Sequence, residues 1–390
     1  MRYDAIVVGL GGMGSAVAAH AASGGMRVLG LEQFGPAHDS GSSHGSTRII
    51  RQAYFESPAY VPLLRRAYEL WDALEARTGT TLRARTGGLF VGRPDTPLVA
   101  GTLESAKRWN LAHEIYDAHE LRRRFPMTTP RDDEIAVYEA VAGAVFPEAA
   151  VRAHLRIAAD AGADLRFHTR TTGWTAGRRG VGVNVGTDVI HTGMLAICSG
   201  PWLSRGTPPS FGKPLRVERN VQFWFAPRIT AAVTPECLPI WCVERDGDRM
   251  FYGFPDFGEG VKIAHHGSGI PADPDDSDRT VRDDEVARAR DALASFVPDA
   301  AGDLARVDPC MYTLTPDEHF VIGPAPGSPR VLIAGGFSGH GFKFAPVVGE
   351  IVATMLAGEA PPFDLSIFAP DRFTPSTAPQ PIPETPSTTS

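Results

Sequence analysis

The sequence has few cysteines, no long apolar run and no excess of positive charge, and each absence excludes a class of protein. Its 390 residues include four cysteines, which are too few and too irregularly spaced for a disulfide framework. No CxxC pair suggests zinc, so we expect no metal site. Cys198, Cys237 and Cys242 are expected to be free thiols that pack like small buried apolar side chains.

The other two absences limit the partners and the location of the chain. No stretch approaches the roughly 18 to 20 apolar residues that a membrane span requires, and the apolar run 5–14 lacks the basic region of a secretory signal. A formal net charge of −7 offers no positive surface to a polyanion, and we interpret the basic run 122–124 as a solvated helix face. We expect a cytoplasmic protein that binds neither membranes nor nucleic acid.

The length and composition predict two domains. A chain that is 43% hydrophobic and 21% charged can bury a large core, and 390 residues are more than one compact core usually holds. The pattern of strands and helices indicates that the domains are interleaved, with residues 1–86, 146–214 and 322–373 in a nucleotide-binding domain and residues 87–145 and 215–321 in a strand-rich substrate domain. The tail 374–390, rich in Pro, Thr and Ser, is expected to be disordered.

Several segments have a clear secondary-structure pattern. The start of the chain predicts a βαβ unit, with a buried strand at 3–8, an Ala-rich helix at 15–22 and a second strand at 27–32. Leu64, Tyr68 and Trp71 recur at helical spacing and predict an amphipathic helix. We also expect helices at 148–161 and 345–357, and strands at 89–91, 164–168, 215–225, 330–336 and within 250–263.

A phosphate-binding pattern follows the first strand. Gly9, Gly11 and Gly14 fit GxGxxG between a strand and a helix, where they permit a tight turn, a close backbone approach to pyrophosphate and helix packing on the strand. Glu32 ends the second strand, where a carboxylate can accept hydrogen bonds from ribose. The fold class is therefore α/β (α+β overall) with a Rossmann-type domain. The motif leaves NAD and FAD open and argues mainly against NADP.

Four longer motifs are more specific than the glycine pattern. The sequence reads SSHGSTRIIR at 42–51, FYGFP at 251–255, CMYTLTPDEHFVIG at 310–323 and GFSGHGFKFAP at 336–346. In this order they resemble the monomeric sarcosine oxidase and N-methyltryptophan oxidase family of amine-oxidising flavoenzymes. The resemblance covers the chain except its tail. It implies FAD as the cofactor and a monomer that binds a small secondary amino acid and O2.

The resemblance also implies how the cofactor is held. In the family, the 8α position of the flavin is attached to the cysteine of the CMYT motif, which is Cys310 here, and a thiolate can add to that electrophilic carbon. Further cofactor-binding positions implied by the matching motifs are Ser42, Arg48, Gly339, Gly341 and Lys343, beside Gly9, Gly11, Gly14 and Glu32.

Two cations match the family's carboxylate-binding pair, and a third matches its oxygen-activating lysine. Arg51 can bind both oxygens of a carboxylate while Lys343 neutralises it; out of context, either would be a surface residue. Lys262 matches the lysine over the flavin face, where a fixed charge stabilises developing superoxide. The alternative for Lys262 is a strand side chain that points to solvent.

The remaining site predictions concern aromatic and basic side chains. Tyr252, His266 and Tyr312 correspond to substrate-pocket positions, and His44 and Arg48 to positions near the flavin ring. The expected catalytic group consists of Lys262, Arg48, His44, Tyr252 and His266. The expected substrate-binding group consists of Arg51, Lys343, Tyr252, Tyr312 and His266. His265 leaves the register of His266 open by one residue. Where sarcosine oxidases have a methionine in the strand before FYGFP, this chain has Trp241 and Cys242, which leaves the substrate side chain open.

The resemblance implies an oxidase acting on the C–N bond of a secondary (N-methyl) amino acid, with sarcosine first. The product imine would hydrolyse to formaldehyde and the primary amino acid, and O2 would become H2O2. Within the fold, the alternatives are a bulkier or cyclic substrate (N-methyltryptophan, pipecolate or proline) or a related amine dehydrogenase. From other classes, a non-catalytic dinucleotide-binding protein and an NAD-dependent dehydrogenase remain as competitors.

Overall fold

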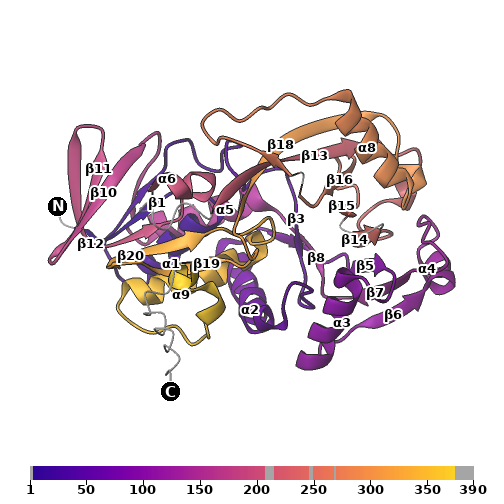
Figure 1. Cartoon of the computed structure of the whole chain (residues 1–390), viewed down its shortest axis with the longest axis horizontal. Helices are drawn as coiled ribbons and strands as arrows, with labels where there is room; N and C mark the ends of the chain where they lie inside the picture. The colour runs from indigo at the N-terminus through magenta and orange to yellow at the C-terminus, as the bar shows by residue number, and fades with distance from the viewer. Residues whose placement is uncertain (1–2, 207–214, 246–248, 268, 374–390) are drawn as a thin grey trace, which may run out of the picture.

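Two large sheets lie in the two halves of an elongated molecule (Figure 1). The computed structural model describes residues 3–206, 215–245, 249–267 and 269–373. The chain passes several times between the halves, which confirms the predicted α/β fold with two interleaved parts. The predicted disordered tail, 374–390, lies outside the described residues.

The first sheet has eight strands in the described residues and a parallel centre. Its path is β10-β11-β12-β1-β2-β9, and β20 pairs with β12 and β19. Ala5 of β1 pairs in parallel with Val28 of β2 and Met194 of β12, and Leu195 of β12 pairs in parallel with Val331 of β20. The strands are β1 (Tyr3–Val8), β2 (Val28–Leu31), β9 (Asp164–Arg166), β10 (Thr171–Gly177), β11 (Gly180–Val185), β12 (Asp188–Ile197), β19 (Val321–Ala325) and β20 (Ser328–Gly335).

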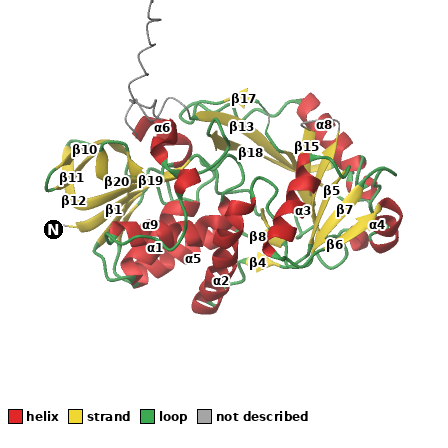
Figure 2. Ribbon diagram, turned by 60° about the horizontal axis from the view of Figure 1, so that its bottom comes forward, coloured by secondary structure: helices red, strands yellow, loops and turns green. Residues whose placement is uncertain are grey.

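Four helices gather beside this sheet, as Figure 2 shows. They are α1 (Gly12–Ser23), α2 (Val61–Thr78), α5 (Pro147–Asp160) and α9 (Ala345–Leu356). Because successive strand residues face opposite sides, Ala5 and Val7 of β1 pack in the helical core, while Ile6 packs with Val181 and Val183 of β11 on the other face. The sheet is therefore buried on both sides, as a parallel sheet requires.

The second sheet has nine strands in the described part of the chain and is mostly antiparallel. Its path is β17-β13-β16-β15-β14-β5-β7-β6, with β18 paired to β13; β5 and β14 are parallel. The strands are β5 (Gly88–Gly92), β6 (Glu114–Asp117), β7 (Ile135–Glu139), β13 (Arg216–Phe225), β14 (Ile240–Arg245), β15 (Arg249–Phe254), β16 (Val261–His265), β17 (Ile270–Pro271) and β18 (Leu304–Leu314).

The two faces of this second sheet have separate cores. Trp241 packs with Leu293 of α8 (Asp283–Ala294), whereas Cys242 packs with Leu98 of α3 (Pro97–Trp109). A small sheet of β3 (Arg48–Ile50), β8 (Gly143–Val145) and β4 (Arg83–Ala84) and the short helices α4 (Ala118–Arg124) and α6 (Leu203–Gly206) complete the regular elements. Single 3-10 turns lie at Pro58–Tyr60, Gly200–Trp202, Thr230–Ala232, Pro298–Ala300, Phe342–Phe344, Ser366–Phe368 and Pro370–Phe373.

Most predicted elements are present, with shifts of one to three residues at their ends. The basic run at 122–124 lies on the exposed part of α4, where Arg123 and Arg124 both pair with Glu120, so that prediction is confirmed. The prediction for Cys237 is wrong: its thiol is free but exposed, whereas Cys198 and Cys242 are free and buried. Among the helices of the described residues, none combines the length and apolarity needed to cross a bilayer.

Candidate functional site

A cavity of about 450 Å³ connects the first sheet with the second, a volume in the usual range for small-molecule sites. Its lining begins at Gly9 and Glu32, after the first two parallel strands, and ends at Cys242 and Tyr252 on the second sheet. The carboxyl ends of parallel strands are where such folds bind ligands. In the described residues, no group of three or more His, Cys, Asp or Glu side chains could hold a metal ion.

The glycine turn after β1 has the geometry that dinucleotide binding needs. Gly9 has φ +85°, and a Cβ there would lie 2.6 Å from the Cys198 carbonyl oxygen. A Cβ on Gly14 would lie 1.7 Å from the Gly9 carbonyl oxygen, so α1 could not pack against the turn. Gly11 differs, because the nearest protein atom to its Cβ would be Ser43 Oγ at 3.5 Å. The space beside Gly11 therefore belongs to the cavity that it lines.

Glu32 is buried and already organises the turn around it. One carboxylate oxygen accepts the Leu10 N–H at 2.8 Å, the other accepts the Phe34 N–H at 3.0 Å, and His38 Nε2 lies 3.4 Å away. Burial alone would raise the pKa of Glu32, but His38 and these N–H groups outweigh it and lower the pKa. The carboxylate is thus an ionised acceptor on the cavity wall.

Arg48 and Cys310 meet beside the segment that carries Ser42. Arg48 Nη2 donates to the Ser42 carbonyl oxygen at 2.9 Å and lies 3.7 Å from Cys310 Sγ. The Ser42 hydroxyl donates to the Met311 carbonyl oxygen at 2.7 Å. Burial would raise the pKa of Cys310, but His44 and Arg48 outweigh it and lower the pKa to about 7. Ser42, Arg48 and Met311 line the cavity, and Cys310 is not among its lining residues, so the thiol lies next to the cavity wall in a cationic environment.

Lys262 on β16 is buried, and the alternative that it points to solvent is wrong. Its Nζ donates to the carbonyl oxygens of Gly45 at 2.6 Å and Thr47 at 2.8 Å, and to Thr47 Oγ1 at 3.2 Å. Burial, followed by Arg48, lowers the pKa of Lys262 well below its usual value. Three acceptors match the three N–H bonds of an ammonium group, so the hydrogen bonds oppose that loss of charge.

Arg51 and Lys343 are brought together at one end of the cavity, which both of them line. Arg51 is 3% exposed and Lys343 is 5% exposed. The Arg51 guanidinium lies 4.3 Å and Lys343 Nζ 5.0 Å from the centroid of the Tyr54 ring. Burial and then Arg51 lower the pKa of Lys343 to about 7. The alternative that these are surface cations is excluded by their burial.

Glu56 is a site residue that the sequence interpretation missed. It accepts a hydrogen bond from Arg51 Nη2 at 2.6 Å; burial would raise its pKa, but Arg51, His340 and Lys343 hold it at about 2. In the sequence, Glu56 is only a single acidic residue five positions after Arg51. Without the fold, nothing indicates that the two side chains meet. One carboxylate facing two cations leaves a positive balance in this part of the cavity.

Two tyrosines and a histidine form the wall next to these cations. The hydroxyls of Tyr252 on β15 and Tyr312 on β18 are 3.1 Å apart, and the His266 ring lies 5.8 Å from the Tyr312 ring. His266 lines the cavity and His265 is not among its lining residues, which resolves the register. Burial lowers the pKa of His266, so its ring is neutral near pH 7.

Glycines and the strand before FYGFP shape the rest of this wall. A Cβ on Gly339, which has φ +81°, would lie 2.4 Å from the Tyr312 ring, and one on Gly341 would lie 2.5 Å from the Phe337 Cβ. Cys242 lines the cavity, while Trp241 lies on the opposite face of the sheet, 6.3 Å from the Phe296 ring. Of the two residues that replace the methionine region of sarcosine oxidases, Cys242 is therefore the one that can contact a substrate.

A family model described as FAD dependent oxidoreductase matches residues 4–355. The chain belongs to the FAD-dependent oxidoreductase family. It is 47% identical to monomeric sarcosine oxidase of Streptomyces avermitilis, over 95% of this chain and 98% of that protein. It is 34% identical to N-methyl-L-tryptophan oxidase of Salmonella newport, over 96% of this chain and all of that protein. The predicted family is confirmed.

Two solved structures share the fold. NikD, an amino acid oxidase of nikkomycin biosynthesis, is 24% identical and superposes with a TM-score of 0.83 over 95% of this chain and 97% of its own. L-Proline dehydrogenase from P. horikoshii is 24% identical, with a TM-score of 0.81 over 95% and 98%.

The residues of this FAD-dependent oxidoreductase fit FAD along the cavity. The open side of Gly11 and the amino end of α1 suit a pyrophosphate, and the ionised Glu32 suits a ribose. The buried Lys262 and the thiol of Cys310 lie at the second sheet, where the ring end of a dinucleotide held at Gly11 would extend. Lys262 and Cys310 lie behind the lining residues, and the chemistry of each region thus matches one part of the cofactor.

Proposed function

We propose that the chain is a flavoprotein oxidase that oxidises the C–N bond of a secondary (N-methyl) amino acid, with sarcosine as the first candidate. The observation that carries the proposal is the pair of buried cations, Arg51 and Lys343, at the end of the FAD cavity. A cavity that binds only an uncharged amine would have no need of two cations that are costly to bury. The 47% identity to a monomeric sarcosine oxidase across nearly its full length supports it.

In this proposal the substrate carboxylate binds Arg51 and Lys343. Arg51 is now paired with Glu56, so a bound carboxylate would share or replace that partner. The guanidinium orients the two oxygens and the ammonium neutralises them. Binding of the carboxylate holds the carbon that is to be oxidised in a fixed position. This positioning lowers the entropic cost of reaching the transition state.

Tyr252, Tyr312 and His266 would hold the amine end of the substrate. Their rings limit the width of the cavity, and the neutral His266 does not repel a cationic amine as it enters. The amine would lose its proton to solvent on binding, and bound FAD would supply the acceptor for a hydride from the N-methyl carbon of the neutral amine. The resulting imine hydrolyses to formaldehyde and the primary amino acid, and no side chain has to act as a strong base.

Lys262 would assist the reduction of O2 to H2O2. A fixed positive charge lowers the energy of superoxide as it develops. The three acceptors around Nζ and the rings of Trp224 at 5.1 Å and Phe254 at 4.9 Å favour the charged form at this buried position.

The proposal includes a covalent bond between Cys310 and the 8α carbon of FAD, with Arg48 and His44 beside the thiol. It also includes a cytoplasmic monomer, divided into the nucleotide-binding residues 1–86, 146–214 and 322–373 and the substrate residues 87–145 and 215–321.

A bulkier or cyclic substrate, or an amine dehydrogenase that does not use O2, would use the same cations. Cys242 and Met250, both on the cavity wall, set the room for the substrate side chain.

The test is turnover of sarcosine, N-methyl-L-tryptophan, pipecolate and L-proline in air, with detection of peroxide. We expect peroxide from sarcosine. Reduction of an artificial acceptor without peroxide would replace the oxidase by a dehydrogenase, and failure of every secondary amino acid to bleach the flavin anaerobically would reject amine oxidation.

The carboxylate site has its own variant. Arg51→Gln should raise KM by about 10- to 100-fold, because a hydrogen bond to a charged group contributes roughly 1.5–3 kcal/mol. The control is Arg65→Gln, which removes an exposed guanidinium that donates to the Trp109 carbonyl oxygen and should leave KM unchanged. Equal effects in the two variants would contradict the site.

A further inference from the structure

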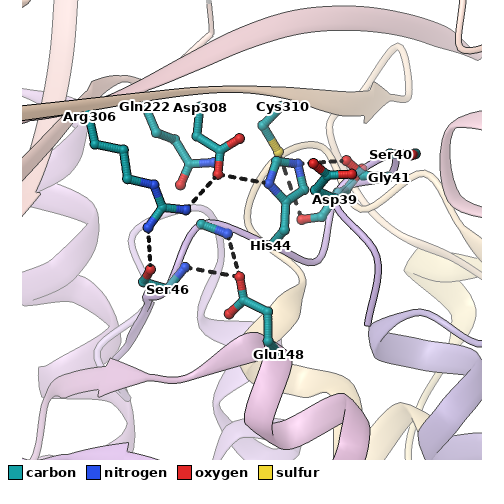
Figure 3. Close-up of polar contacts among 12 residues, drawn as sticks. Asp39, Ser40, Gly41, His44, Ser46, Glu148, Gln222, Arg306, Asp308 and Cys310 are labelled. Atoms are coloured by element: carbon teal, nitrogen blue, oxygen red, sulfur yellow. Dashed lines mark hydrogen bonds and ion pairs between the residues drawn. The ribbon is translucent and has the colours of Figure 1, made fainter. Parts of the chain in front are cut away.

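His44 is buried between two hydrogen-bond acceptors. Its Nδ1 lies 3.2 Å from Asp308 Oδ2, and its Nε2 lies 3.1 Å from the Gly41 carbonyl oxygen. A carbonyl oxygen cannot donate, and neither can an ionised carboxylate. Both ring nitrogens must therefore carry a proton for both hydrogen bonds to exist, so the geometry selects the imidazolium form of His44 (Figure 3).

Asp308 is fixed in place as a carboxylate. Arg306 Nη2 donates to its Oδ2 at 3.0 Å, and Arg279 Nη2 lies 3.6 Å from its Oδ1. Burial would raise the pKa of Asp308, but His44 and Arg306 outweigh it and lower the pKa. Asp308 and Cys310 are two positions apart on β18, so both side chains leave the same face of the strand. The strand thus sets the spacing between the carboxylate and the thiol.

We propose that Asp308 is a positioning residue for the attachment of FAD: it holds His44 as an imidazolium beside Cys310, so that the sulfur is present as the thiolate that forms the bond. The inference rests on the proposed covalent link at Cys310, and it assigns to Asp308 a role that the sequence motifs gave no reason to expect. Asp308 acts through His44 and does not touch the sulfur itself.

Other charged groups around this cluster come from several elements. Arg48 of β3 lies beside Cys310 Sγ, Glu148 of α5 accepts the Gly45 and Ser46 N–H groups at 2.7 and 3.2 Å, and Lys262 of β16 binds the Gly45 carbonyl oxygen. Arg306 and Arg279 face Asp308. Figure 3 shows Glu148 on the side of the loop away from Cys310, so Asp308 is the carboxylate in direct contact with the imidazole.

The ionisation of the cluster agrees with this geometry. Burial would lower the pKa of His44, but Cys310 and Asp308 outweigh it and raise it to about 9. The pKa of Cys310 is lowered to about 7. Between these two values imidazolium and thiolate coexist. Cys198 and Cys242, which lack such a partner, have pKa values raised to about 12 by burial.

Formation of the bond between Cys310 and FAD is a two-electron oxidation, and O2 is the oxidant. The thiolate electron pair forms the C–S bond to the 8α carbon, and one C–H bond of the methyl group breaks. Overall, a thiol and a methyl group become a thioether, and two protons and two electrons pass to O2 as H2O2. The thiolate is the nucleophilic form in such steps, so its population sets the rate at a given pH.

The test compares Asp308→Asn with Glu259→Gln in the full-length chain produced under riboflavin depletion. The asparagine keeps an oxygen that can accept from His44 and removes the charge. Glu259 pairs with Arg306 at 2.8 Å, so the control removes a neighbouring carboxylate that does not contact His44. Alkylation by iodoacetamide, resolved by peptide mass spectrometry between pH 5.5 and 9.5, reports the thiolate of Cys310.

We expect half-maximal Cys310 alkylation near pH 7 in the wild type and Glu259→Gln, and a midpoint at least about one pH unit higher in Asp308→Asn. FAD is then added in air, and covalent FAD is followed by intact mass. At pH 7 a midpoint one unit higher lowers the thiolate fraction from about one half to about one tenth, so incorporation at pH 7 should be at least about fivefold slower and should recover at pH 9. Recovery at high pH is an outcome that a misfolded variant would not give.

A second variant tests whether Asp308 acts through His44. In a His44→Gln background, adding Asp308→Asn should slow incorporation no further. An unshifted midpoint in Asp308→Asn, or an additive effect in the double variant, overturns the role of Asp308. A wild type that gains no covalent FAD at any pH, while its Cys310 midpoint is near 7, instead overturns the proposed covalent link and with it the attachment role.

Discussion

Lys343 is the cation of the proposed substrate site whose charge changes near neutral pH. Its pKa is lowered to about 7 by burial and by Arg51, so the ammonium is present below pH 7 and is lost as the pH rises through this value. A bound carboxylate favours the ammonium, so binding above pH 7 must be accompanied by proton uptake. Carboxylate affinity should therefore be constant below pH 7 and fall above it, by up to about tenfold per pH unit.

The measurement is the inhibition constant of propionate between pH 6 and 9, because propionate has the carboxylate and no amine that titrates in this range. Lys343→Met should bind propionate more weakly at pH 6 and show little change with pH. A wild-type inhibition constant that stays flat from pH 6 to 9 would show that Lys343 keeps one protonation state throughout.

At the scale of the elements, the turn between β1 and α1 contains one glycine that the fold requires and another that cofactor binding requires. A Cβ on Gly14 would collide with the Gly9 carbonyl oxygen at 1.7 Å, whereas one on Gly11 would be 3.5 Å from the nearest protein atom. Gly14→Ala should destabilise the chain without FAD by about 1–3 kcal/mol, as overpacking does. Gly11→Ala should change its stability by less than about 1 kcal/mol and still weaken FAD binding.

Urea unfolding of the FAD-free chains and titration with FAD distinguish the two effects. If Gly11→Ala binds FAD as tightly as the wild type, the backbone at Gly11 does not approach the pyrophosphate, and the cofactor lies elsewhere in the cavity.

The elements that the sequence predicted correctly are those whose pattern is local. The strand Tyr3–Val8 and the helix Ala345–Leu356 are runs of apolar residues that are buried nearly all round. The helix Val61–Thr78, with Leu64 and Trp71 inside, has the apolar spacing of one buried face. The strands of β10 and β11 were missed, because their short alternating pattern is rich in Gly and Thr and resembles a loop.

The site was predictable where a motif carried it and not where the fold created it. Arg51, Lys262 and Cys310 lie inside motifs. Glu56 and Asp308 have no motif of their own, and Asp308 meets His44 only because β18 crosses the loop that follows Glu32. Cys237 was expected to be buried from its residue type alone, and residue type does not fix the environment of a single thiol.

For the molecule as a whole, the segment after β17 connects the two halves across the cavity. Asp275 accepts hydrogen bonds from Trp202 Nε1 at 2.7 Å and Arg170 Nη2 at 3.1 Å, and it also pairs with Arg205. Trp202, Arg170 and Arg205 line the cavity. Asp273 also pairs with Arg205, so two carboxylates fasten the segment to the half that contains the first sheet, and the carboxylate of Asp275 makes most of these contacts.

Removing that carboxylate should loosen the connection without unfolding either half. Asp275→Asn should lower the free energy of unfolding by about 1 kcal/mol, because the carboxylate is partly exposed and solvent screens its ion pairs. It should also speed hydrogen exchange of residues 269–282. Asp276→Asn is the matched control. It removes the adjacent carboxylate, whereas the three contacts are made by Asp275. Unchanged exchange in Asp275→Asn would show that other contacts hold the segment.

β12 lies between β1 and β20, so the central sheet joins the beginning, the middle and nearly the end of the chain. During synthesis on the ribosome, β1 must wait for β12, and the pair must wait for β20 before the sheet is complete. Such distant pairings slow folding because the intervening chain must be closed first. Capture of the dinucleotide is therefore expected to follow release of the finished polypeptide, and a translation pause in the second half of the message would lengthen the time that an open, aggregation-prone β1–α1 unit is exposed.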